Sequence, residues 1–169
     1  MIYPFKEKTP QIAEGVFVAK SADIIGDVTI GEESSLWFNT VVRGDTGPIT
    51  IGRGVNIQDN SIIHLDYNMS VVIEDNVTVG HGCIIHGATL EKGALIGMGA
   101  IILDGAHIGE GAIVGAGSIV TAGKKISPNM LAIGSPAKEV REVKEEERAR
   151  VIEGVDTYKA KAQIYYSMG

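Results

Sequence analysis

The sequence predicts an all-β solenoid that ends in an α-helix. Large aliphatic residues return at every sixth position along most of the 169 residues. This period matches neither the 3.6-residue repeat of an amphipathic helix nor the two-residue alternation of a half-buried strand. Glycine often follows the aliphatic residue directly, and a small or β-branched residue stands four positions after it. Beyond Pro136 the repeat gives way to charged, helix-forming residues.

The repeat runs in four blocks. Its aliphatic positions are Val18, Ile24, Ile30, Leu36 and Val42; Ile51, Ile57 and Ile63; Ile73, Val79 and Ile85; and Leu90, Ile96, Ile102, Ile108, Val114, Val120 and Ile126, with a last unit slipped by one residue to Ile133. The small positions include Ala22, Ser34, Ser61, Cys83, Thr89, Ala94 and Ala100. We expect the aliphatic side chains to point inward and the small residues to fill corners, so that short strands alternate with turns.

This pattern resembles the hexapeptide repeat of left-handed parallel β-helices, in which three hexapeptides form one triangular coil of about eighteen residues. Together with the change in composition after Pro136, it predicts a β-helix over residues 1–137 and a helix over residues 138–169 that packs on it. The helix would carry one apolar stripe, formed by Val151, Val155, Tyr158, Ala162 and Tyr165. A stripe of this kind is buried against a face of the solenoid, its own or a neighbour's.

Length and a hydrophobic content of 44% agree with a single domain. The net charge of −6, without a long basic cluster, argues against nucleic acid as a partner. No apolar run reaches membrane-spanning length, and the segment MIYPFKEKTP lacks the apolar core of a signal peptide, so we expect a cytoplasmic protein without a membrane partner. The one cysteine, Cys83, excludes an internal disulfide and occupies a corner position, which favours a packed thiol over a catalytic one.

Three breaks in the period predict loops at the corners. They fall between Val42 and Ile51, between Ile63 and Ile73, and between Ile85 and Leu90, which are 9, 10 and 5 residues apart. Spacings above six indicate insertions, and the spacing of five indicates a deletion. Insertions at solenoid corners become loops on one side of the molecule, which is often the binding side.

Counting hexapeptides around three faces places Arg43, His64 and His86 in one column on successive coils. His64 and His86 are 22 residues apart, and subtracting the four-residue insertion between them leaves one coil. Neighbouring coils are spaced like parallel strands, about 4.8 Å apart. Two imidazoles at that separation can both bind one metal ion. His81 belongs to the preceding hexapeptide, on the face that carries Gln58 in the previous coil.

One subunit therefore offers two stacked histidines and a third that is turned away. A cyclic trimer would bring His81 of one subunit beside His64 and His86 of the next. Three neutral imidazoles with an open fourth position are typical of a catalytic zinc that binds and acidifies water, and they also suit Fe²⁺ or Co²⁺. His107, the fourth histidine, lies at an outward corner of an unbroken stretch, and we expect it to be a surface residue satisfied by hydrogen bonds.

Three segments resemble the signature of the γ-class carbonic anhydrases: RGD at 43–45, NIQDNSIIH at 56–64 and GHGCIIHG at 80–87. The resemblance covers nearly the whole chain. It implies a trimer of left-handed β-helices that hydrates CO2 reversibly to bicarbonate. His64 and His86 would bind the metal from one subunit and His81 from the other.

The same resemblance implies further roles around the metal. Gln58 and Asn56 would orient the water at the metal by hydrogen bonds. Arg43 and Asp59 would form an ion pair across the interface, and Arg43 would also attract bicarbonate. Asp45 would hold its loop rather than take part in the chemistry.

The sequence departs from the family's best-studied enzymes at two places. Thr46 follows RGD where those enzymes carry a glutamate, and the loop after His64 is short, with Asp66 as its one carboxylate. Without a positioned acid, proton export would depend on buffer or water.

Two further interpretations stay open. One is an acyltransferase or thioesterase that uses an interface histidine as a base on coenzyme A thioesters. The other is a non-catalytic trimer that serves as a metal-binding scaffold.

Overall fold

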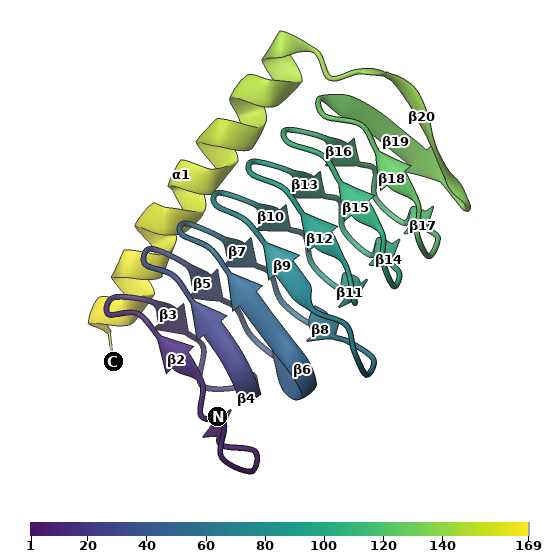
Figure 1. The fold of residues 1–169 in the computed structure, drawn as a ribbon. Helices are drawn as coiled ribbons and strands as arrows, with labels where there is room; N and C mark the ends of the chain where they lie inside the picture. The colour runs from purple at the N-terminus through teal and green to yellow at the C-terminus, as the bar shows by residue number, and fades with distance from the viewer. Residues whose placement is uncertain (169) are drawn as a thin grey trace.

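A computed structural model describes residues 1–168 as a parallel β-solenoid with a helix lying along one side (Figure 1). Successive coils add short strands to three faces. The first face contains β1 (Ile2–Tyr3), β4 (Asp23–Ile30), β6 (Val41–Ile51), β8 (Ile62–His64), β11 (Ile84–His86), β14 (Ile101–Ile102) and β17 (Ile119–Val120). The predicted fold class is confirmed.

The other two faces follow the same order along the stack. The second contains β2 (Gln11–Ile12), β9 (Val71–Ile73), β12 (Thr89–Leu90), β15 (His107–Ile108) and β18 (Lys125–Ile126), together with the second halves of β4 and β6. The third contains β3 (Phe17–Val18), β5 (Ser35–Leu36), β7 (Asn56–Ile57), β10 (Thr78–Val79), β13 (Leu95–Ile96), β16 (Ile113–Val114), β19 (Met130–Gly134) and β20 (Ala137–Glu142).

The core is a stack of inward aliphatic side chains in strict register. On the first face Val42 pairs with Ile63, and Ile85 pairs with both Ile63 and Ile102. All four side chains are fully buried. Each contributes roughly 1.5–3 kcal/mol by leaving water, and a shift of one residue would turn every one of them outward. The stacked aliphatics therefore fix which side chains meet on the outer surface.

Two details of the predicted register are wrong. Ala132, not Ile133, fills the inward position of the last parallel coil, because β16 pairs Val114 with Ala132 and leaves Ile133 46% exposed. The shortened unit before Leu90 places Ala88 in the buried corner position and turns Thr89 outward beside His107. In both cases the inward–outward alternation of the strand decides the position.

Small polar residues at the corners connect one coil to the next. The buried hydroxyl of Ser61 donates to the Gly80 carbonyl at 3.0 Å and accepts from the Cys83 amide at 3.2 Å. Cys83 is itself buried, and burial raises the pKa of its thiol, as expected for a packed corner. These bonds satisfy polar groups that have no access to water.

The RGD segment lies where β4 and β6 run side by side through a corner. A side chain at Gly44 would place its Cβ 2.6 Å from the Asp27 carbonyl oxygen, closer than packing allows. Glycine therefore lets the two strands bend together, with Arg43 and Asp45 on either side of the bend. The three-residue insertion predicted here is absorbed by the long strand β6.

The C-terminal segment begins with a strand, not with the helix expected from residue 138. Strand β20 pairs antiparallel with β19, and helix α1 (Glu145–Ser167) starts only after it. The charged composition favoured helix, but β19 offers an open edge, and pairing covers that edge. No helix among residues 1–168 combines the length and the apolar character needed to cross a membrane.

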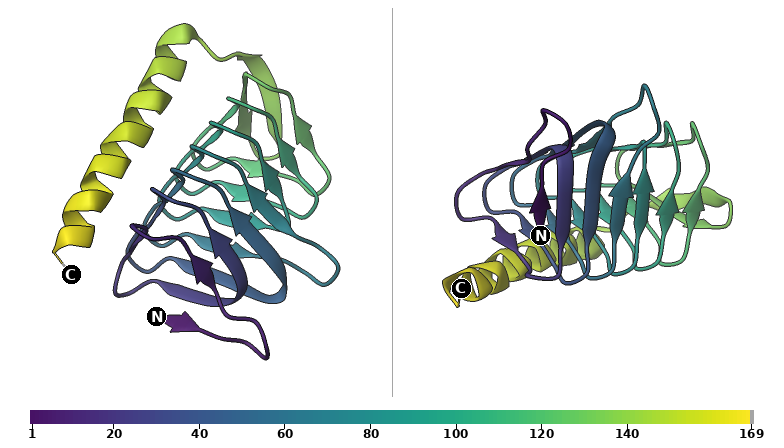
Figure 2. Two further views of the ribbon diagram at one scale, coloured as in Figure 1. Left: turned by 60° about the vertical axis from the view of Figure 1, so that its left-hand side comes forward. Right: turned by 90° about the horizontal axis from the view of Figure 1, so that it is seen from below.

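Helix α1 runs back along the stack, so that its C-terminal half contacts β3, β5 and β7 in the first coils (Figure 2). Val155 and Ala162 of the predicted stripe are buried. Trp37 lies edge-on to Tyr158 and Tyr165, with ring centroids 5.3 and 5.4 Å apart and interplanar angles of 85°. This aromatic cluster sets the position of the helix on the solenoid.

The first turn of α1 is held by Glu147, and replacing this residue with Gln should loosen it. Glu147 accepts two hydrogen bonds from Arg141, both at 2.7 Å, and one from the Lys144 backbone amide at 2.9 Å. These bonds, led by those from Arg141, lower the pKa of Glu147 from 4.5 to about 2. Because the folded pKa is the lower one, the stabilisation is present above the ordinary pKa and disappears as the pH falls toward about 2.

Hydrogen–deuterium exchange at neutral pH tests this prediction. The first-turn amides should exchange faster in Glu147→Gln than in the natural protein, and Glu153→Gln, which changes an exposed carboxylate in the middle of the same helix, should leave them protected. Equal protection in the two variants would refute the role of Glu147.

Candidate functional site

Two of the three histidines singled out by the sequence stack on the first face. Strand β11 pairs with β8 so that His86 lies beside His64. The rings have centroids 5.2 Å apart, and His64 Nδ1 lies 3.2 Å from His86 Nε2. Arg43 follows Val42, which pairs with Ile63, so Arg43 continues the column on the preceding coil. The expected column of Arg43, His64 and His86 is therefore present.

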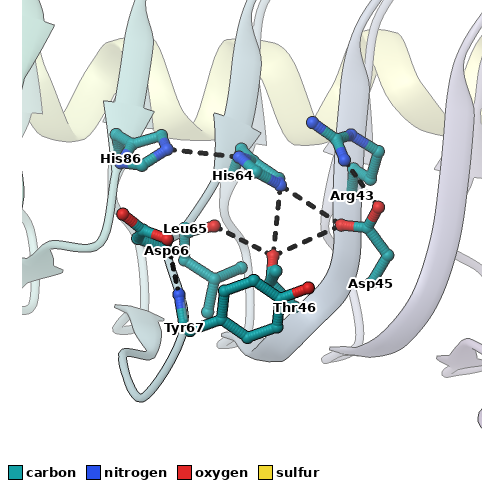
Figure 3. A network of polar contacts seen from close by, with 8 residues as sticks. All are labelled: Arg43, Asp45, Thr46, His64, Leu65, Asp66, Tyr67 and His86. Carbon is teal, nitrogen blue, oxygen red and sulfur yellow. Dashed lines mark hydrogen bonds and ion pairs between the residues drawn. The ribbon is translucent and has the colours of Figure 1, made fainter.

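The ring nitrogens that do not face each other meet carboxylates. His64 Nε2 lies 3.2 Å from Asp45 Oδ1, and His86 Nδ1 lies 2.6 Å from Asp104 Oδ1. Figure 3 shows His86, His64 and Asp45 in a row, with Arg43 at its end. We call this group, Arg43, Asp45, His64, His86 and Asp104, the two-histidine edge.

Asp45 links the arginine to the nearer histidine. Arg43 Nη1 lies 2.5 Å from Asp45 Oδ2. Partial burial alone would raise the pKa of Asp45, but the hydrogen bonds from Arg43 and His64 outweigh it and hold that pKa below its usual range. Asp45 therefore orients two side chains of the edge in addition to holding its loop.

Thr46 fastens the loop that follows His64. Its hydroxyl donates to the Leu65 carbonyl at 2.9 Å and lies 3.3 Å from His64 Nε2. Asp66, the one carboxylate of that loop, accepts the Tyr67 backbone amide at 2.8 Å. Thr46 is thus engaged in holding the loop, whereas Asp66 is exposed and bonded only to the amide of the next residue.

His81 lies apart, at the corner that precedes β11. Its Nδ1 is 2.8 Å from Asp59 Oδ2, and its Nε2 is 3.5 Å from the Tyr158 hydroxyl of helix α1. Burial, with a smaller contribution from the charge of Asp59, raises the pKa of Tyr158. His81 lies on the same side of the solenoid as Gln58, as expected. The residue that contacts it is Asp59, which follows Gln58.

The two amides expected near the metal form a buried network on the same side. Gln58 Nε2 donates to Asn56 Oδ1 at 3.0 Å, and Asn56 Nδ2 donates to the Thr78 hydroxyl at 2.9 Å. Because the Gln58 nitrogen is used in this way, its carbonyl is the end that remains to accept a hydrogen bond. We call Asn56, Gln58, Asp59, His81 and Tyr158 the His81 edge.

Within residues 1–168, no group of three histidine, cysteine or acidic side chains is arranged to hold a metal ion. The two edges lie on opposite sides of the first face: the two-histidine edge where β8 and β11 end, and the His81 edge at the corners before they begin. One chain therefore presents two half-sites.

Comparisons with known proteins agree on the fold and the family. Residues 87–122 match the family of bacterial transferase hexapeptide repeats. The chain is 57% identical to a carbonic anhydrase of Geobacillus kaustophilus, over 99% of this chain and 92% of the relative. It is 43% identical to the mitochondrial γ carbonic anhydrase 2 of Arabidopsis thaliana, over 95% of this chain and 60% of the longer plant protein. The chain belongs to the γ-class carbonic anhydrase family.

One solved structure carries a different name. The crystal structure of a Bacillus cereus protein, provisionally named an acetyltransferase, is 53% identical and superposes with a TM-score of 0.99 over 100% of this chain and 98% of that one. Names taken from the hexapeptide repeat describe a fold that many activities share. The activity therefore has to be argued from the side chains of the site.

The structure places two residues at the site that the sequence did not single out. Asp104 follows His86 by 18 residues, but this coil is one residue short, and the pairing of Ile85 with Ile102 puts Leu103 at the position that matches His86. Coil counting alone therefore points to the residue before Asp104. Tyr158 was expected only in the buried stripe of the helix, because the repeat does not determine how the helix docks. The ion pair expected between Arg43 and Asp59 of different subunits stays a prediction. His107 is satisfied by Glu91 at 2.7 Å, as expected of a surface histidine, but it lies in strand β15 and not at a corner.

Replacing Thr46 with Val should free the loop after His64. Loss of the hydrogen bond to the Leu65 carbonyl should lower the free energy that keeps the loop closed by about 1 kcal/mol. Backbone amides 66–70 should therefore exchange faster with deuterium. Thr50→Val, which changes an exposed threonine of the same strand, is the matched control. Unchanged exchange in Thr46→Val would show that the loop is held by other contacts.

Proposed function

We propose that this chain is a metal-dependent carbonic anhydrase that interconverts CO2 and bicarbonate. The observation that carries the proposal is the two-histidine edge, where one nitrogen of each imidazole faces the other ring and the second nitrogen faces a carboxylate. Pairs of this kind orient metal-binding histidines in proteins. His81 is paired with a carboxylate in the same way, because its Nδ1 faces Asp59.

The donor set fits a zinc ion. Zinc–nitrogen bonds of 2.0–2.1 Å in a tetrahedral arrangement place two ligand nitrogens about 3.3 Å apart. The separation between His64 Nδ1 and His86 Nε2 is 3.2 Å. Neutral imidazoles also suit Fe²⁺ and Co²⁺, so the proposal names zinc first and tests the metal directly.

We propose a homotrimer because the half-sites lie on opposite edges of one face. Between them runs an outward ladder of aliphatic residues in parallel register: Val41, Ile62, Ile84, Ile101 and Ile119. Ile62 is 43% exposed in the single chain. A continuous apolar strip of this kind favours burial against another protein surface. A head-to-tail contact that closes after three copies would cover it and join the His81 edge of one chain to the two-histidine edge of the next.

In this arrangement His64, His86 and His81 of the partner subunit would hold the metal. A zinc ion bound there supplies Lewis-acid activation of water near neutral pH, chemistry for which carbonic anhydrase is the standard example. Asp45 and Asp104 keep the two histidines of one chain oriented. The Gln58 carbonyl, fixed by Asn56, would accept a hydrogen bond from the attacking water and turn it toward CO2. The guanidinium of Arg43, 44% exposed, would attract bicarbonate.

The competing activity is acyl transfer from coenzyme A thioesters. The pair of His81 and Asp59 is a histidine oriented by a carboxylate, which is the arrangement of a general base. A transferase base needs no partner histidines, however, and the paired imidazoles at 3.2 Å then have no role. A metal-binding scaffold without activity would keep the imidazoles but hydrate no CO2. The cytoplasmic location expected from the sequence stays a prediction.

Metal content and CO2 hydration, measured on one sample purified without a histidine tag, test the function. We expect about one zinc per chain and hydration above the uncatalysed rate. Zinc without hydration would support the scaffold, and hydrolysis or transfer of an acyl group without zinc would support the transferase.

The shared site predicts complementation between variants. His81→Ala and His64→Ala should each lose the metal while staying folded, because both side chains point away from the core. In mixed trimers, the interface between the intact two-histidine edge of one variant and the intact His81 edge of the other keeps all three ligands. Partial zinc binding should therefore return on mixing. Mixed trimers that bind no zinc would eliminate the interface site.

Because Thr46 stands where the best-studied relatives carry a glutamate and the loop after His64 is short, we expect the rate to depend on external buffer. Steady-state hydration should rise with imidazole concentration at constant pH and ionic strength, since buffer carries the proton away. Isotope exchange between CO2 and water at chemical equilibrium, with zinc content as a check, separates this step from the interconversion itself. A rate that does not respond to buffer would imply an internal acid.

A further inference from the structure

Asp104 makes the shortest contact between a ring nitrogen and a carboxylate at either edge. Its Oδ1 lies 2.6 Å from His86 Nδ1, compared with 2.8 Å for Asp59 and His81 and 3.2 Å for Asp45 and His64. Asp104 comes from the coil that follows His86, at the corner after β14. It therefore belongs neither to the family signature segments nor to the strands that carry the histidines.

Backbone hydrogen bonds fix the corner that carries this carboxylate. The Asp104 carbonyl accepts the Gly123 amide at 2.8 Å, and the amide of Gly105, the next residue, donates to the Gly87 carbonyl at 2.7 Å. Gly87, directly after His86, has a φ of +54°, and a Cβ there would collide with the Asp104 carboxylate. The corner at Gly87 thus leaves open the space that the carboxylate fills.

The chemistry of the contact determines where the proton of His86 lies. A carboxylate only accepts hydrogen bonds, so the proton in this contact belongs to His86 Nδ1. A neutral imidazole carries one proton, which leaves the lone pair on Nε2. That nitrogen is the one that points toward His64, at 3.2 Å.

We infer that Asp104 is a positioning residue that fixes His86 as the tautomer protonated on Nδ1 and keeps its Nε2 lone pair directed into the metal site. The part of this inference that concerns metal affinity rests on the proposed function. The part that concerns the tautomer holds for the chain alone. Asp104 touches neither CO2 nor the metal and acts through His86.

Two measurements on Asp104→Ala test the inference. In the metal-free protein, long-range ¹H–¹⁵N correlation spectra report which ring nitrogen is protonated. His86 should show the Nδ1-protonated pattern in the natural protein and lose it in the variant. Zinc affinity, measured by competition with a chromophoric chelator, should fall about 10- to 100-fold.

Glu91→Ala is the matched control. Glu91 Oε1 lies 2.7 Å from His107 Nε2, a contact of the same kind on the second face. Removing it should change the tautomer signal of His107 and leave zinc affinity unaltered. Asp104→Asn keeps the shape of the corner and serves as a second variant in case the alanine variant misfolds. Its zinc affinity should also fall, because an amide carries no charge.

An Nδ1-protonated pattern of His86 that persists in Asp104→Ala would overturn the inference, as would unchanged zinc affinity in both Asp104 variants. If the natural protein binds neither zinc nor Fe²⁺ nor Co²⁺, the proposed function fails. The tautomer spectra still decide whether Asp104 orients His86, because they need no metal.

Discussion

Parallel stacking of coils at the spacing of neighbouring strands is the constraint on which the structure depends. Val42, Ile63, Ile85 and Ile102 lie above one another because each strand pairs in register with the next. The outward neighbours of these residues then have no freedom in register. His64 and His86 meet because they follow Ile63 and Ile85, and Arg43 lies in the same column because it follows Val42. The core thus determines the surface chemistry.

Aspartate carboxylates orient the histidine rings that the stacking brings together. Each of the three histidines that we assign to the metal has an aspartate within 3.2 Å of one ring nitrogen. These aspartates come from different parts of the coil: Asp45 from strand β6, Asp59 from the corner before β8 and Asp104 from the corner after β14. A single chain therefore holds its imidazoles oriented before any partner or metal arrives, and such preorganisation lowers the free-energy cost of binding.

The sequence was sufficient to predict what the repeat controls. The six-residue period located the buried aliphatics and brought His64 beside His86. It did not locate Asp104, because the shortened unit before Leu90 puts Leu103 at the matching position of the next coil. Prediction failed where tertiary contacts override composition. The charged segment after residue 138 forms β20 first because β19 offers an open edge, and Ala132 replaces Ile133 because pairing with Val114 fixes the register. The approach of Tyr158 to His81 depends on how α1 docks on Trp37, which no periodicity describes.

Helix α1 also changes how the stack comes apart. In a linear array each coil touches only its neighbours, so the ends can peel away one coil at a time. Here the helix begins three residues after the last strand, β20, and its C-terminal half contacts β3, β5 and β7 of the first coils. It acts as a strap that links the two ends of the array. Peeling from either end must break this strap, which makes cooperative, all-or-none melting the expected behaviour of a fold that would otherwise unravel gradually.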